Sequence, residues 1–193
     1  MEPGFVKDKI YDKIDFKIAP LPKAEYEKCH FNNCDLSNTD LSEIKFVECE
    51  FSNCNLSLAK LNMTAFKDIK FNDCKMLGLQ FSHCYEFGLS FSFKNCVLNH
   101  SSFYQTKVKK TIFANTKLQE VDFTECDLAG STFENCDLTG ASFDHTILEK
   151  TDLRTSYNYS IDPAANRIKK AKFSLSEIGG LLYKYDIEID NAN

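Results

Sequence analysis

Residues 113–145 read FANTKLQEVDFTECDLAGSTFENCDLTGASFDH, and every fifth residue in this stretch, counted from Phe113, is large and apolar. The same spacing extends in both directions. One unbroken series runs from Phe31 to Phe81, and a second runs from Phe93 to Leu153. A period of five matches neither the 3.6-residue period of an α-helix nor the two-residue alternation of a half-buried strand. The chain therefore consists of internal repeats of five residues, and these repeats determine the fold.

A second, smaller inward position accompanies each apolar centre. Small or compact residues stand two places before many centres, at Cys34, Thr39, Ala59, Thr64, Cys74, Thr106, Thr116, Ser131, Ala141 and Thr151. Two inward side chains in every five residues suit a square coil in which each pentapeptide forms one side. Successive coils then stack at about 4.7–4.9 Å with backbone hydrogen bonds between them. The pattern predicts an all-β solenoid whose axis is filled by the centre residues.

The repeat is interrupted in four places. Residues 1–25 match it poorly and include Pro20 and Pro22, so they are expected to cap the first coil. The repeat proper spans 26–173, with a two-residue phase shift that predicts a bulge or loop within 85–95 and a second loop at 155–167. Residues 174–193 change character: helical spacing predicts a short helix that begins near Ser174, and the alternation at 186–189 predicts a short strand.

Nine cysteines raise the question of disulfides or a metal site. All nine fall at the small inward position, with Cys84 included if the first register continues to residue 86. Buried free cysteine behaves as a small hydrophobe, and parallel side chains do not converge as a disulfide requires. We expect structural thiols, no metal and no cofactor. Inward thiols favour a reducing compartment and predict a cytoplasmic protein.

Acidic residues are concentrated in the C-terminal half of the repeat. Between Thr116 and Leu153 there are nine acids but only two bases, Lys117 and Lys150, and the repeat register turns every acid outward. Such a surface repels nucleic acid phosphates and attracts a basic, DNA-binding surface. Solubility alone is the simpler explanation of the same charges.

No catalytic constellation is visible. The four histidines fall at outward positions, and none of the common nucleophile, phosphate-binding or zinc motifs occurs. A filled axis and flat sides also lack the concave pocket that small-molecule sites favour. There is no apolar run long enough for a membrane span, and no signal peptide pattern is visible at the N-terminus. The sequence predicts a binding protein rather than an enzyme.

The segments CDLAG (126–130), CDLTG (136–140) and ASFDH (141–145) resemble the A(D/N)LXX motif of pentapeptide-repeat proteins. The resemblance covers about residues 11–173 and implies a right-handed quadrilateral β-helix, here with a short C-terminal helix. The segment 167–189, together with Ile161-Asp162-Pro163, resembles the C-terminal ending of the bacterial quinolone-resistance (Qnr) group within that family. In that group the ending forms a two-fold dimer, and the acidic rod mimics duplex DNA and binds DNA gyrase or topoisomerase IV.

The resemblance implies site residues of two kinds. The dimer interface would consist of Leu175, Ile178, Leu181, Leu182 and Tyr183. The topoisomerase-binding acidic face would consist of Glu120, Asp122, Glu125, Asp127, Glu134, Asp137, Asp144 and Asp152. Members of the group that protect gyrase carry two projecting loops. Here there is no insertion around 50–54, and only the two-residue shift occurs near 92–95.

Two functions follow from different classes of protein. The first is a DNA mimic that modulates a type II topoisomerase, binds no nucleic acid itself and contacts no membrane. The second is a rigid scaffold with another protein partner, bound through exposed apolar residues such as Val47, Leu58, Tyr104 and Ile112.

Overall fold

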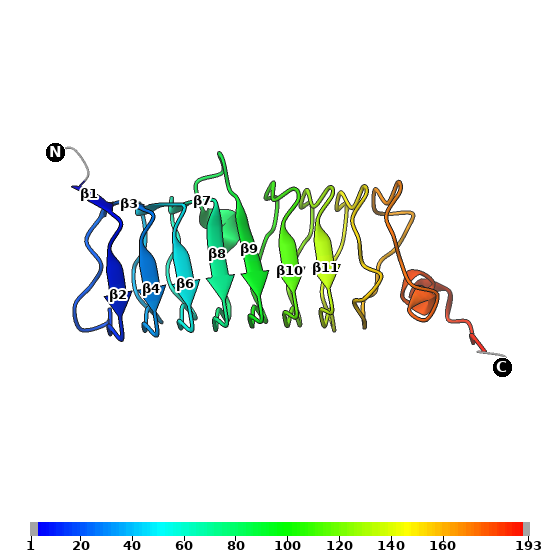
Figure 1. Ribbon diagram of the computed structural model, residues 1–193. Helices are drawn as coiled ribbons and strands as arrows, with labels where there is room; N and C mark the ends of the chain where they lie inside the picture. Colours follow the sequence, from blue (N-terminus) through cyan, green and yellow to red (C-terminus); the bar gives the residue numbers. More distant parts are fainter. Residues whose placement is uncertain (1–3, 191–193) are drawn as a thin grey trace.

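The structure is a computed structural model that describes residues 4–190, an all-β parallel solenoid of about seven turns (Figure 1). The predicted repeat fold is therefore confirmed. Its strands are short, and the chain bends sharply between them. They are β1 (Gly4–Lys7), β2 (Ile10–Asp12), β3 (Ala24–Glu27), β4 (His30–Asn32), β5 (Lys45–Val47), β6 (Glu50–Ser52), β7 (Ala65–Lys67), β8 (Ile69–Asn72), β9 (Phe91–Lys94), β10 (Ile112–Ala114) and β11 (Thr132–Glu134).

Each coil has four sides. Side 1 carries the sheet β1-β3-β5-β7, and side 2 carries the sheet β2-β4-β6-β8-β9-β10-β11. Side 3 is linked by isolated parallel bridges such as Asp35 to Asn55, and side 4 by bridges such as Asp122 to Ser142. After the last strand of its sheet, side 1 continues as isolated bridges that link residues 107, 127, 147 and 167 in turn. Most paired residues are 20 apart, so outward residues 20 apart lie one above another on the same side.

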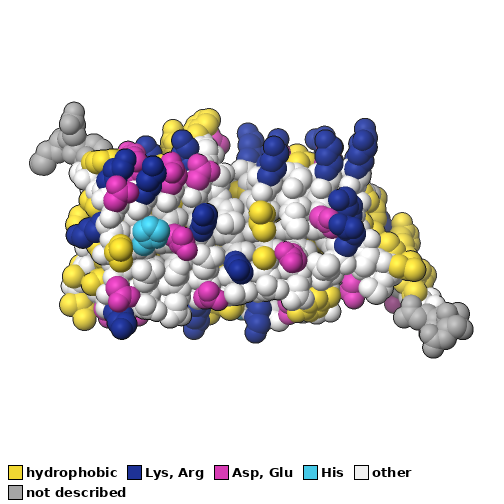
Figure 2. Space-filling model, viewed as in Figure 1, with side chains coloured by type: hydrophobic (Ala, Val, Ile, Leu, Met, Phe, Trp, Pro, Cys, Tyr) yellow, Lys and Arg dark blue, Asp and Glu magenta, His cyan; other side chains and the backbone are white. Residues whose placement is uncertain are grey.

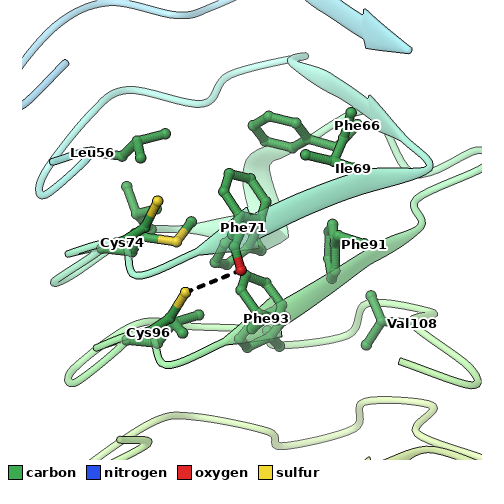
Figure 3. Packing of buried hydrophobic residues seen from close by; sticks show 14 of the residues in the cluster. Leu56, Phe66, Ile69, Phe71, Cys74, Phe91, Phe93, Cys96 and Val108 are labelled. Carbon is green, nitrogen blue, oxygen red and sulfur yellow. Dashed lines mark hydrogen bonds between the residues drawn. The ribbon is translucent and has the colours of Figure 1, made fainter. Parts of the chain in front are cut away.

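The apolar centres form stacked columns along the axis. On side 2 the rings of Phe71, Phe93, Phe113 and Phe133 stack with centroid separations of 5.3, 5.2 and 4.7 Å. Figure 3 shows the first two of these rings. Rings on neighbouring sides meet edge to face, as Phe113 does with Phe123 at 6.1 Å and 81°. Both geometries are favourable for aromatic pairs. The axis is therefore closed by side chains.

The small inward residues hold consecutive coils together. In many coils their hydroxyl or thiol group donates a hydrogen bond to the carbonyl of a centre residue in the preceding coil. Thr64 Oγ1 lies 2.8 Å from the carbonyl of Leu41, and Cys96 Sγ lies 3.4 Å from that of Phe71 (Figure 3). This second role explains why the position accepts Cys, Thr and Ser.

All nine cysteines are free and buried, as the repeat register predicts. Burial raises the pKa of the thiols of Cys49 and Cys136 to about 11 and that of Cys126 to about 12. These three thiols stay protonated near neutral pH, which makes them poor nucleophiles.

The phase shift produces a loop on side 1. Between β8 and β9 the register is offset by 22 residues, with Phe71 beside Phe93. The extra residues protrude between β8 and β9 (Figure 1). Leu89 and Phe91 fill the interior there, whereas Glu86, which the unshifted register places at a centre, is exposed. Burial of apolar residues thus determines where the phase changes.

The first coil belongs to the ladder. β1 pairs with β3 and β2 pairs with β4, so residues 4–12 of the expected capping segment are part of the β-helix. Phe5, Ile10 and Ile18 remain exposed at this end. The segment 155–167 also stays in the ladder, through bridges at Tyr157 and Arg167.

The predicted short C-terminal helix begins at Ile178 rather than near Ser174, and it is not α-helical. Residues 178–185 instead form two short 3-10 helices, η2 (Ile178–Leu181) and η3 (Tyr183–Tyr185), and a third, η1 (Phe81–His83), lies in the repeat. Two adjacent glycines weaken an α-helix, and the amide of Ile161 bonds the carbonyl of Gly180 at 2.9 Å, which fixes the segment against the last coil. Residues 186–190 are irregular, so the predicted strand at 186–189 is absent.

Within residues 4–190, no helix has the length and apolar character that a membrane crossing requires.

Candidate functional site

The coil geometry assigns every outward side chain to one side of the rod. A count of charges along the sequence mixes all four sides, whereas a partner approaches from one direction. Each predicted site residue is therefore placed by its column.

Four of the predicted acidic residues come together on side 4. Asp122 and Asp144 lie on that side, and Glu120 and Glu125 lie at its two corners. Across three consecutive coils, residues 100–105, 120–125 and 140–145, this side contains no lysine or arginine. We call Glu120, Asp122, Glu125 and Asp144 the acidic side.

Local partners of the acidic side are mostly neutral. Glu125 accepts a hydrogen bond from Gln105 at 2.8 Å, and Asp122 accepts one from the backbone amide of Thr124 at 2.9 Å. Histidines lie beside the other two, with Nδ1 of His100 3.1 Å from Glu120 and Nδ1 of His145 3.1 Å from Asp144. These carboxylates face solvent on a single side.

The other four predicted acids lie elsewhere. Asp127 is on side 1, Glu134 and Asp152 on side 2, and Asp137 on side 3.

Two of these four acids are paired with cations. Lys109 lies 3.0 Å from Asp127, and Asp152 lies 2.8 Å from Arg154 and 3.4 Å from Lys172. The Arg154 guanidinium lowers the pKa of Asp152 to about 2. The eight acids therefore do not form one face.

Asp137 is stabilised as an anion by neutral groups. Partial burial acts to raise its pKa, but hydrogen bonds from Thr139, Asn158 and Gln119 outweigh burial and lower it. Asn158 Nδ2 lies 3.1 Å from the carboxylate and Gln119 Nε2 lies 2.6 Å from it. These contacts link three coils, which is a structural role.

The predicted dimer residues differ widely in accessibility. Leu175 is 87% exposed and Tyr183 is 54% exposed, whereas Leu181 is only 8% exposed and packs on the core. Ile178 and Leu182 are half-buried. Leu181 is thus part of the protein interior, and two-fold association through the remaining residues stays a prediction.

The apolar residues expected of a scaffold surface do not meet. Leu58, Tyr104 and Ile112 are exposed and Val47 is half-buried. Val47 lies in β5 on side 1, Ile112 in β10 on side 2, Leu58 at the corner after side 3, and Tyr104 on side 4. They offer no continuous patch.

A basic surface on side 1 was not predicted. Residues 107–110 and 167–170 contribute to it. These two segments flank the acidic segment in sequence and lie on the same side of the rod as Lys150. The basic surface can be found in the sequence by comparing residues 20 apart, because such residues lie one above another on the same side. Within residues 4–190, no three His, Cys, Asp or Glu side chains are grouped so that they could hold a metal ion.

Comparison with known proteins agrees with this geometry. A model of the pentapeptide repeat region matches residues 24–92 and 89–159. Among curated protein sequences, none is significantly similar to this chain.

Solved structures share the fold at low sequence identity. The plasmid-mediated fluoroquinolone resistance protein QnrB1, treated with trypsin, is 16% identical, with a TM-score of 0.57, and the match covers 99% of this chain and 100% of QnrB1. HetL from the cyanobacterium Nostoc sp. strain PCC 7120, a pentapeptide repeat protein involved in heterocyst differentiation regulation, is 12% identical, with a TM-score of 0.50, and the match covers 91% and 88%. The repeat model spans well over half of the sequence and the four-sided coil extends through it, so the chain belongs to the pentapeptide repeat family.

Proposed function

We propose that this protein is a non-catalytic binding rod that presents its acidic side to the DNA-binding surface of a type II topoisomerase such as DNA gyrase. The single observation that supports the proposal is the acidic side itself. Glu120, Asp122 and Glu125 lie on one side of one coil and Asp144 lies on the same side of the next, and no lysine or arginine lies between them.

The spacing of these charges suits a surface that normally binds phosphates. Coils are about 4.8 Å apart, so Asp144 lies near the three carboxylates of the preceding coil on a rigid support. A partner's lysines and arginines, arranged for a nucleic acid backbone, are attracted over a distance of about a Debye length, 8–10 Å at physiological salt. The support does not have to reorganise on binding, which limits the entropic cost of association.

The scaffold alternative is less well supported. Its four candidate residues lie on four different sides, and a protein interface generally needs a contiguous buried centre. HetL, which shares the fold, is involved in heterocyst differentiation regulation, so the fold itself serves more than one role.

The test is a gyrase supercoiling assay titrated with the purified protein, with and without a fluoroquinolone. We expect inhibition that weakens as salt is raised. A variant with Glu120→Gln, Glu125→Gln and Asp144→Asn is expected to lose the effect. The matched control is Asp8→Asn, Glu48→Gln and Glu188→Gln, which changes the net charge equally but leaves side 4 intact, and it should inhibit as the parent does.

Two results would contradict the proposal. The first is no effect on gyrase or topoisomerase IV at the highest soluble concentration. The second is equal loss in the side 4 variant and its control, since that would make net charge alone responsible. Relief of drug inhibition would show that protection needs no projecting loop other than the one between β8 and β9.

A further inference from the structure

Side 1 changes its charge pattern halfway along the rod. In the N-terminal half, opposite charges alternate in successive coils and pair. Glu25 lies 2.9 Å from Lys45, and Lys28 lies 3.8 Å from Glu48. Such cross-strand pairs stabilise a sheet modestly. Much of the charge on this half of side 1 is therefore paired within the protein.

In the C-terminal half of side 1 the alternation stops. Seven basic residues stand on three of four consecutive coils, since the coil at 127–130 has none, and only two acids, Asp127 and Glu149, lie among them. Figure 2 shows lysine and arginine side chains in a row along the upper edge of this half. We call this set the basic ridge: Lys107, Lys109, Lys110, Lys150, Arg167, Lys169 and Lys170.

Most of the ridge charge is uncompensated. Lys109 is paired with Asp127 and Arg167 with Glu149, at 3.0 and 2.7 Å. The other five lysines have no carboxylate within 4.0 Å among residues 4–190. All seven cations are exposed.

Lysines of the ridge lie above one another in the same corner column. The amide of Lys110 bonds the carbonyl of Ala129, that of Gly130 bonds Glu149, and that of Lys150 bonds Lys169. Lys110, Gly130, Lys150 and Lys170 therefore occupy equivalent corners of successive coils, all with positive φ. Of these corners only Lys150 and Lys170 are like charges in neighbouring coils, where they repel each other, so this pair opposes folding and suits an external anion.

The protruding loop lies at the N-terminal end of the ridge. The amide of Tyr85 bonds Thr64 and that of Ser90 bonds Phe66, which places the loop on side 1 beside β7. A hollow of about 350 Å³ between the loop and the next coil is lined by Glu86, Leu89, Tyr104 and Gln105. Residue 107, where the ridge begins, follows directly. Figure 2 shows hydrophobic side chains at the upper edge just before the row of cations.

The loop carries an exposed aromatic pair. Phe87 is 69% exposed and Tyr85 is 42% exposed, with their ring centroids 5.5 Å apart. An exposed phenylalanine at the tip of a loop gains nothing from the core. Aromatic side chains followed by a basic track are the combination that binds single-stranded nucleic acid, in which bases stack on rings and phosphates follow the cations.

We propose that the basic ridge and the Tyr85–Phe87 pair together bind single-stranded nucleic acid. This differs from the expectation, drawn from charges counted along the sequence, that the chain binds none. The ridge is one side wide and is bordered at its corner by Glu125 of the acidic side. A duplex would bring its second strand of phosphates toward those carboxylates, whereas a single strand fits the narrow track. The site is separate from the acidic side and does not depend on gyrase binding.

The test is fluorescence anisotropy with a labelled 20-nucleotide oligo(dT), its duplex with oligo(dA), and poly-glutamate as competitor. The ridge variant is Lys110→Gln, Lys150→Gln and Lys170→Gln. The matched control is Lys60→Gln, Lys75→Gln and Lys94→Gln, three exposed lysines on sides 4, 3 and 2. Circular dichroism and thermal melting establish that both variants remain folded.

We expect oligo(dT) to bind, and the ridge variant to bind about tenfold more weakly with a log K against log salt slope reduced by about two, since each phosphate contact contributes about 0.7. The control should match the parent. Phe87→Ala should weaken oligo(dT) binding about fivefold or more without changing the salt slope. Glu86→Gln, which removes a carboxylate beside the track, should strengthen it.

Three outcomes would overturn the proposal. One is equal affinity for oligo(dT) in the ridge variant and its control. Another is duplex binding as tight as single-strand binding, with no effect of Phe87→Ala. The third is displacement by poly-glutamate as effective as by unlabelled oligo(dT), again with Phe87→Ala neutral, which would assign the ridge to an acidic polypeptide.

Discussion

At the scale of the residue, the neighbouring coils restrict which side chains each inward position can accept. A centre must fill the axis and pack on the coils before and after it, so the choice is among Phe, Leu and a few similar residues. The position two before must be small and, in many coils, must donate to a carbonyl in the preceding coil, as Thr64 and Cys96 do. Outward positions carry neither requirement.

Phe113 provides a test of the centre position. It is fully buried and stacks on Phe133 and Phe93, so Phe113→Ala removes a ring from the middle of a column. We expect a loss of about 3–5 kcal/mol in the free energy of unfolding. Phe113→Leu, which places at this site the residue found at other centres, should cost much less. Urea unfolding measures both, and equal losses would contradict the packing argument.

The difference between inward and outward positions explains what could be predicted from sequence. The period of five, the filled axis and the buried cysteines depend on inward residues, which the repeat constrains. Glu86 shows where this fails: its place in the count is a centre, but Leu89 and Phe91 are better buried there and the phase shifts. The predicted acidic face contained all four residues of the acidic side but added four that lie elsewhere, because the sides and partners of outward residues such as Asp127 and Asp152 appear only once the coil closes.

At the scale of the element, the C-terminal segment shows how a contact overrides a helical pattern. Leu175, Ile178, Leu181 and Leu182 have helical spacing, but the chain forms only η2 and η3. Gly180 lies so close to the last coil that a Cβ atom there would be 2.2 Å from the carbonyl oxygen of Tyr159 and within 2.9 Å of its ring. The glycine is required by this close approach.

Gly180→Ala and its neighbour therefore form a matched pair. We expect Gly180→Ala to destabilise the segment by about 1–3 kcal/mol, because the backbone of Tyr159 must move. Gly179→Ala should be neutral or slightly stabilising, because its Cβ would meet only the end of the Ile189 side chain at 3.4 Å and alanine restricts the unfolded chain. Hydrogen exchange of amides in 175–185 distinguishes them. Equal protection in both variants would contradict the account.

At the scale of the whole molecule, ion pairs between coils make stability depend on pH. The Arg154 guanidinium lowers the pKa of Asp152 to about 2. Burial acts to raise the pKa of Asp35, but hydrogen bonds from Lys17 and Ser37 outweigh it and also lower that pKa to about 2. Both carboxylates bind a neighbouring coil, to Lys172 and Lys17.

The direction of the pH effect follows from these shifts. An unfolded aspartate has a pKa of about 3.9, so the folded state binds fewer protons, and the stabilisation present above about pH 4 is lost as the pH falls toward 2. We expect the melting temperature of the parent to fall across that interval. A variant with Asp35→Asn and Asp152→Asn should start lower at pH 7 and fall less. Parallel curves for the two proteins would rule out these carboxylates as the cause.

The 20-residue spacing of the coils also bears on how such a molecule can change over generations. Gain or loss of one whole turn leaves every remaining residue on its own side, so the rod lengthens or shortens while its surface map is preserved. The 22-residue coil that contains the loop shows that two extra residues can be absorbed at a corner without turning later coils. Each side can therefore acquire its own charge by single substitutions, and a protein of one domain can carry an acidic and a basic surface at right angles.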